Sequence, residues 1–389
     1  MVTLTNADNV LKSLYLEALS NQLNTTTNPL YNKFVSTERD VWGKEIIKLA
    51  PYGMNGGIGA GTETGDLPAS AGNNYKQFKQ TLKNLYGTIE ISDKAIRASA
   101  NNSGAFLSLL DAEMDGLLAA SKFNFGRMLF GSGSGVLTAV ASVDGNEVVV
   151  DSVQYLMEGM VVDFLHSGVA VTGYTGRRIT AIDRAASTIT ISGTAIVEGE
   201  IVADDEITLQ GSYNNELTGL EAIFDSDITS LYGLTKADNP WLKPYTDTVT
   251  NITETEIQTV IDELESFSGS TADYIVCSYG VRRAYQAYMR SKSSNIEFTN
   301  LDGGFKALSY NGIPLVADRF CPANTMYILS AKDFNLHQLC DWRWLEGEHG
   351  QVLKQIAGKP SYSATLVKYA DLICNKPNAQ AKLTGITEA

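Results

Sequence analysis

The chain has 389 residues, of which 44% are hydrophobic and 19% are charged, so it can build two or three cores and is too apolar to be disordered. Its formal net charge of -14 disfavours nucleic-acid binding, because phosphate contacts require clustered Lys and Arg. No apolar run reaches the roughly 18 residues of a membrane span, and the first residues lack a signal-peptide pattern. A folded protein made and kept in a cytoplasm is therefore expected.

Residues 1–52 predict an N-terminal arm. Apolar residues recur at helical spacing between residues 5 and 24, and a polar stretch rich in Asn and Thr follows. This pattern predicts a short amphipathic helix that packs either on its own subunit or on a neighbouring one.

Residues 53–91 predict an extended loop with a glycine-rich tip. Neither face of its second half is cleanly apolar, so this ribbon forms either a half-exposed hairpin or a contact with a neighbouring subunit. Basic side chains nearby would make such a contact salt-sensitive. The predicted intersubunit contact residues are aromatic or basic: Tyr75, Lys76, Phe78, Lys79, Lys83 and Arg97.

Residues 92–137 predict a long helix and its surroundings. Asn102 or Ser103 can cap the helix, apolar residues recur at spacings of three and four, and Gly131 offers a stop. A helix over residues 103–130 would be about 40 Å long at about 1.5 Å per residue, which is the length of a structural spine.

Residues 138–212 differ in composition from the rest of the chain. They contain no Cys, Trp, Pro or Lys, and short β-branched runs alternate with turn residues. Eleven acidic residues and three Arg give this segment a net charge of -8. We expect a small all-β barrel or sandwich inserted into a host fold.

The host fold resumes at residue 213. A helix over residues 253–268, a strand over 273–277, a helix over 279–292 and further strands predict a mixed α+β domain over 213–345. Residues 346–389 predict strands that return to the domain of the long helix.

Motifs for catalysis or cofactor binding are absent from the sequence. The Gly57-x-Gly59-x-Gly61 run lacks the flanking strand, helix and Lys of a phosphate-binding loop. The three His residues form no metal-ligand motif, no Gly-x-Ser-x-Gly elbow occurs, and the four Cys residues are far apart. We therefore expect no enzyme activity, no metal and no cofactor.

The order of elements resembles that of tailed-phage major capsid proteins with the HK97-type fold. The resemblance rests on the arm, the glycine-tipped loop with Tyr75 to Lys79, the spine helix, the strand and helix around Ala272 to Tyr279, and the turn and strand from Tyr310 to Val316. It implies an α+β capsid fold with arm, extended loop, peripheral domain and axial domain (213–345), interrupted by the β insertion.

The resemblance also implies function and partners. Copies of the chain would assemble as hexamers and pentamers into an icosahedral head around double-stranded DNA, which is enclosed without sequence-specific binding. Expected partners are other copies, a scaffolding protein, a portal and a decoration protein, with no membrane. The expected location is the virion capsid, assembled in the bacterial cytoplasm.

Two alternatives stay open from the sequence alone. An encapsulin-like nanocompartment shell shares the fold, and a cargo enzyme beside the gene would favour it. A β-rich surface adhesin would use the 138–212 segment, although this segment has few aromatic residues for a sugar platform.

Overall fold

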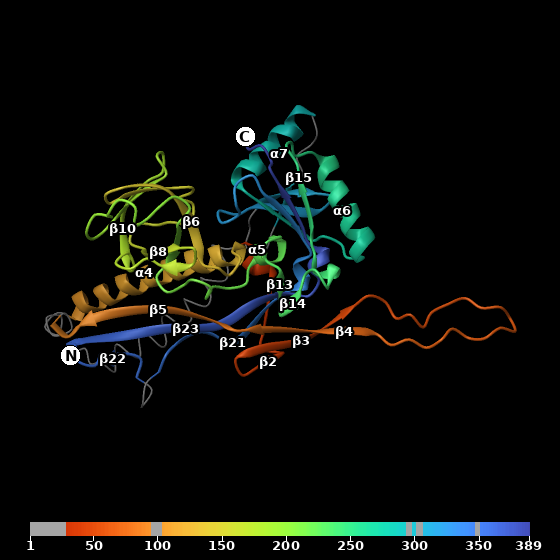
Figure 1. The fold of residues 1–389 in the computed structure, drawn as a ribbon, viewed down its shortest axis with the longest axis horizontal. Helices are drawn as coiled ribbons and strands as arrows, with labels where there is room; N and C mark the ends of the chain where they lie inside the picture. Colours follow the sequence, from red (N-terminus) through yellow and green to blue (C-terminus); the bar gives the residue numbers. More distant parts are fainter. Residues whose placement is uncertain (1–28, 95–102, 293–297, 301–305, 347–350) are drawn as a thin grey trace.

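A computed structural model describes residues 29–94, 103–292, 298–300, 306–346 and 351–389 (Figure 1). The expected amphipathic helix over residues 5–24 and the predicted contact residue Arg97 lie outside the described residues. Among the residues described, no helix has the length and apolarity needed to cross a membrane.

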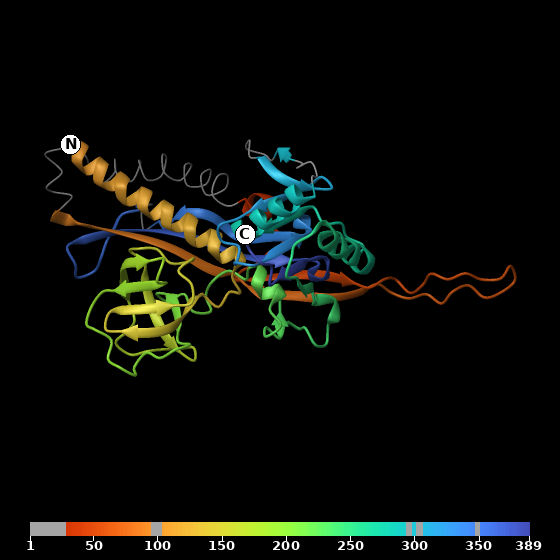
Figure 2. The same ribbon diagram turned by 90° about the horizontal axis from the view of Figure 1, so that it is seen from above.

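A long sheet and the spine helix form one end of the molecule. The helix α4 (Ser103–Phe130) has the predicted bounds and runs along the sheet (Figures 1 and 2). Gly87 on the sheet makes room for it, because a Cβ atom there would lie 2.8 Å from Leu117 Cδ1. The strands of this sheet are β1 (Val35–Thr37), β5 (Lys83–Ser92), β21 (Phe334–Trp344), β22 (Lys354–Gln355) and β23 (Ser361–Cys374), and β23 pairs with β5, β21 and β22.

A hairpin leaves this body and projects far to one side (Figure 1). It comprises β3 (Glu45–Tyr52) and β4 (Asn74–Thr81), with β2 (Val41–Trp42) on its edge, and residues 53–73 form its tip. The predicted loop 53–91 was therefore wrong in its bounds. Its first strand lies in the expected arm, and its last segment is β5, which pairs with β23 along its full length.

The strands between residues 136 and 209 form a closed barrel rather than a sandwich. β10 pairs with both β11 and β8, which closes the ring, and β9 extends β8 as a small hairpin. The barrel has its own hydrophobic core. Its strands are β6 (Val136–Asp144), β7 (Glu147–Val150), β8 (Val161–His166), β9 (Val169–Ala170), β10 (Arg177–Asp183), β11 (Thr188–Ile191) and β12 (Glu206–Leu209).

A second seven-stranded sheet, called the axial sheet because most of its strands lie in the predicted axial domain, carries α6 (Glu254–Ser268) and α7 (Tyr279–Ser291) on one face. The side chains of Thr253 and Ser278 cap the two helices, and Gly269 ends α6 with φ 62°. In sheet order the strands are β15 (Tyr245–Thr248), β24 (Ala381–Thr384), β20 (Met326–Leu329), β16 (Tyr274–Cys277), β19 (Ile313–Ala317), β18 (Lys306–Tyr310) and β17 (Phe298–Asn300).

The predicted division at residue 345 was wrong for two strands. β21 was expected in the axial domain, but it belongs to the long sheet, whereas β24 was expected to return to the peripheral domain, but it lies inside the axial sheet. Sequence order does not determine sheet membership here, because the chain crosses between the two sheets more than once. The remaining short elements are α5 (Leu220–Phe224), β13 (Ser230–Leu231) and β14 (Leu234–Thr235).

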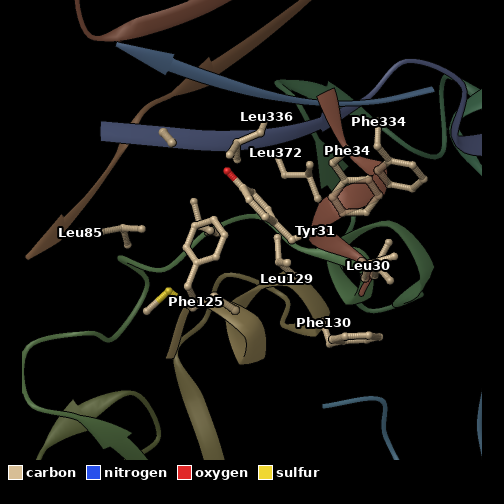
Figure 3. Packing of buried hydrophobic residues seen from close by; sticks show 14 of the residues in the cluster. Leu30, Tyr31, Phe34, Leu85, Phe125, Leu129, Phe130, Phe334, Leu336 and Leu372 are labelled. Atoms are coloured by element: carbon tan, nitrogen blue, oxygen red, sulfur yellow. The ribbon is translucent and has the colours of Figure 1, made fainter. Parts of the chain in front are cut away.

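The main core fills the space between α4 and the long sheet (Figure 3). Tyr31 packs edge-on against Phe125 of α4 with 5.0 Å between ring centroids, and Phe34 stacks on Phe334 at 4.9 Å. The segment before β1 is therefore fixed to the subunit through aromatic contacts.

Candidate subunit-contact surface

The projecting hairpin is anchored to its own subunit by stacked aromatic rings. Phe78 of β4 is fully buried, and its ring lies 5.1 Å from Tyr232 and 5.8 Å from Trp241. Trp241 also stacks on Tyr52 of β3 at 5.4 Å. The prediction of Phe78 as an intersubunit contact was wrong, because its side chain is enclosed by residues of its own chain.

A buried polar group fixes the base of the hairpin. Gln80 Nε2 donates to Asp371 Oδ2 at 2.9 Å, and the Thr218 backbone N–H donates to Asp371 Oδ1 at 2.7 Å. Burial raises the pKa of Asp371, while these hydrogen bonds oppose the shift. No local sequence pattern marks this group, since its members come from β4, the 213–219 segment and β23.

The hairpin exposes large apolar side chains. Within a single subunit these side chains remain in contact with water, and exposed apolar side chains gathered on one projecting element typically mark a protein contact. The exposed fractions along β3, the tip and β4 are Leu49 64%, Met54 84%, Ile58 83%, Leu67 90% and Tyr75 54%, and Trp42 of the edge strand β2, at the base, is 70% exposed. The apolar residues of the glycine-rich tip, which the sequence analysis did not select, therefore belong to the candidate surface.

The predicted basic contact residues differ in their surroundings. Lys76 is exposed, and Lys79 is exposed and lies 3.2 Å from Glu45 across the hairpin. Lys83 is half-buried, and its Nζ donates to the Asn214 carbonyl at 2.8 Å, so it holds the strand β5 to its own chain. Tyr75, Lys76 and Lys79 stay candidate contact residues.

Contacts on two sides hold the barrel and the segment that follows it to the rest of the subunit. Arg127 of α4 forms a buried, two-point ion pair with Glu216, which follows the last barrel strand, with distances of 2.8 and 2.6 Å. On the other side, Gln154 Nε2 donates to the carbonyls of Arg319 and Cys321 at 2.8 and 3.0 Å. These contacts set the position of the barrel relative to α4 and the axial sheet.

Among the described residues, no group of three or more His, Cys, Asp or Glu side chains is placed to hold a metal ion. His166 Nδ1 lies 2.6 Å from Asp205 Oδ1, and His166 is largely exposed. Over the residues that the structure describes, no Ser, Thr or Cys side chain forms a hydrogen bond with this pair. Burial raises the pKa of Cys277, Cys321 and Cys374, which makes these thiols unreactive.

Comparison with known proteins identifies a solved structure with a similar fold. No family model and no curated protein matches the sequence. A capsid chain of the cyanophage A-1(L) is 13% identical, with a TM-score of 0.55 over 92% of this chain and 91% of that chain. This likeness shows that the chain has the fold of that capsid protein, in agreement with the predicted HK97-type capsid fold.

Two further solved structures are similar to this chain with lower scores. A capsid chain of a native GTA particle is 11% identical, with a TM-score of 0.48 over 92% of this chain and 90% of that chain. An encapsulin from Synechococcus elongatus PCC 7942 is 10% identical, with a TM-score of 0.46 over 95% of both chains. Because both scores are below 0.5, the fold assignment rests on the cyanophage chain.

Proposed function

We propose that this chain is the structural major capsid protein of a tailed phage, which self-assembles into the icosahedral shell around the double-stranded DNA genome. Hexamers and pentamers of the chain would form the closed shell. The capsid fold supports this proposal, and the projecting hairpin is the observation that carries it.

The hairpin supports assembly because its two ends have different environments. Its base is anchored by the buried ring of Phe78 and by Asp371, whereas its tip presents Met54, Ile58 and Leu67 to water. A rigidly held arm with an apolar end fits a strap that lies on a neighbouring subunit. Burial of each such side chain contributes about 1.5–3 kcal/mol, and a closed shell repeats the contact in every copy.

The test removes the tip and keeps its anchor. We expect a variant with residues 53–73 replaced by an Asn-Gly turn to fold, because β3 and β4 stay paired up to Tyr52 and Asn74. It should fail to form closed particles in negative-stain electron microscopy, whereas the parent chain forms them. A variant with Lys332→Ala, at an exposed position of the long-sheet end, is the control and should assemble normally. Normal particles from the tip deletion would contradict the strap.

We also propose that the barrel is an insertion in the host fold. The segment that enters the barrel and the segment that leaves it lie side by side, since the Asn214 N–H donates to the Ser134 carbonyl at 2.7 Å. A short link can therefore replace the whole barrel. Joining residue 134 to residue 214 should leave the host domains folded and change particle stability or size. Loss of folding in that variant would contradict the insertion.

Further partners follow from the proposed role. A scaffolding protein, a portal and a decoration protein would join the shell, which would be assembled in the bacterial cytoplasm and become part of the virion. The net charge of -14 suits a container that encloses DNA without binding it in a sequence-specific way. Co-expression of the chain with its gene neighbours, followed by particle analysis, tests these partners.

A further inference from the structure

The two helices on the axial sheet carry opposite charge. α6 contains five acidic residues and no Lys or Arg, whereas α7 contains three Arg and no acidic residue and is followed by Lys292 at its C-cap. Both helices bury their apolar sides in the same core, through residues such as Ile257 and Val281. Their remaining sides are therefore free to carry charge.

Each of these helices exposes charged side chains near its C-terminal end. Asp262 and Glu265 on α6 are exposed, as are Arg290 and Lys292 at the end of α7. No ion pair joins an α6 carboxylate to any basic residue within the part of the chain that the structure describes. In Figure 1 the two helices lie apart, with α7 near the top of the domain and α6 on its outer side.

The acidic face is unfavourable within one subunit. Asp262 and Glu265 are three residues apart on the helix, where like charges repel each other, and α6 contains no Lys or Arg. Asp262 accepts a hydrogen bond from Gln258 Nε2 at 2.6 Å, which leaves its negative charge without a countercharge. One large apolar side chain accompanies this charge: Phe267, 81% exposed, at the end of α6. Tyr279, 47% exposed, lies at the start of α7, at the opposite end of that helix from Arg290. Large exposed aromatic side chains are typical of contact surfaces.

We propose that the acidic face of α6 docks on the basic face of α7 of a second copy of the chain. The inference rests on the proposed self-assembly and names the surfaces that meet. Because the two surfaces differ, the contact is head-to-tail, and each copy offers one surface to each neighbour. Repetition of such a contact closes into a ring when the rotation permits. A symmetric contact of α6 with α6 is excluded by repulsion between the carboxylates.

Charge reversal tests this pairing. The α6 variant carries Asp262→Lys and Glu265→Lys, and the α7 variant carries Arg290→Glu and Lys292→Glu. Arg283 is left unchanged because its Nε donates to the Ala389 carbonyl. A third variant combines all four substitutions, and a control carries Glu198→Lys and Glu200→Lys at exposed barrel positions, which changes the net charge as much as the α6 variant does. Assembled and free subunits are quantified by sedimentation velocity, and circular dichroism checks the fold.

We expect each single-face variant to lose assembly by at least about tenfold, as a loss of about 1.4 kcal/mol per contact predicts. The combined variant should recover assembly, because basic α6 then meets acidic α7, and the control should assemble like the parent chain. Higher salt should weaken the parent contact, since exposed pairs are screened. Single-face variants that assemble like the control, or a folded combined variant that does not recover, would overturn the pairing. A parent chain that never assembles would instead refute the proposed function.

Discussion

The buried ion pair between Arg127 and Glu216 gives the sharpest prediction for the subunit. Both side chains are 4% exposed, and the closest contact, from Arg127 Nη2 to Glu216 Oε1, is 2.6 Å. Glu216→Gln leaves a buried guanidinium without its countercharge, which costs about 3–5 kcal/mol. The double variant with Arg127→Met and Glu216→Leu removes both charges, and we expect it to retain stability to within about 1–2 kcal/mol of the parent.

The assay is urea unfolding of the unassembled subunit, followed by tryptophan fluorescence. Trp342 is a suitable probe because its ring lies 6.3 Å from Phe125, two residues before Arg127. Hydrogen exchange at the end of α4 then shows whether the loss is local to this joint. The reasoning is refuted if Glu216→Gln loses less than about 1 kcal/mol of unfolding free energy, or if the double variant loses as much as Glu216→Gln does.

Three further predictions concern single positions. Burial raises the pKa of Asp318 from 3.8 to about 6, so the folded state favours the protonated carboxyl. The resulting contribution to the free energy of unfolding is fully present below pH 3.8 and is lost as the pH rises to about 6. Relative to Asp318→Asn, the parent should therefore lose on the order of 3 kcal/mol across that window in pH-dependent urea unfolding, and parallel pH profiles would contradict the shift. Phe78→Ala should lower the free energy of unfolding of the subunit by about 3–5 kcal/mol, whereas Tyr75→Ala should change it by less than about 0.5 kcal/mol and should reduce only the particle yield. Equal changes in the melting temperature of the two variants would contradict these different roles. Lys368 is fully buried, and its Nζ lies 2.6 Å from Asp341, whose side chain is 41% exposed, and donates to the buried Gln338 Oε1 at 3.0 Å. Lys368→Met leaves a carboxylate that water can reach and an amide oxygen without its donor, so it should lower the free energy of unfolding by about 1–3 kcal/mol; a loss above about 5 kcal/mol in urea unfolding would refute this.

Elements with strong local signals were predictable from the sequence. The long helix follows from apolar spacing and a glycine stop, and the structure places it at Ser103–Phe130. The helix α6 follows from the Thr253 cap and Gly269. The all-β character of residues 138–212 follows from β-branched runs between turn residues, and the structure confirms it with seven strands. Each of these signals depends on residues that are close in sequence.

The role of Phe78 could not be predicted in the same way. Its neighbours in sequence are polar, so the strand shows no apolar face, and the rings that bury it belong to Tyr232 and Trp241. For the same reason the Arg127–Glu216 pair was not foreseen, because the two residues are 89 positions apart. Partners at such separations leave no periodic pattern that a single sequence reveals.

The position of the last two strands has a consequence for synthesis on the ribosome. β23 lies between β5 and β21 in the long sheet, and β24 lies between β15 and β20 in the axial sheet. A nascent chain therefore cannot complete the long sheet until residue 374 has left the exit tunnel, and it cannot complete the axial sheet until residue 384 has left it. The barrel strands are contiguous in sequence, so this part can fold during translation. The order of folding thus keeps unfinished chains from presenting a complete subunit to their neighbours on the same messenger RNA.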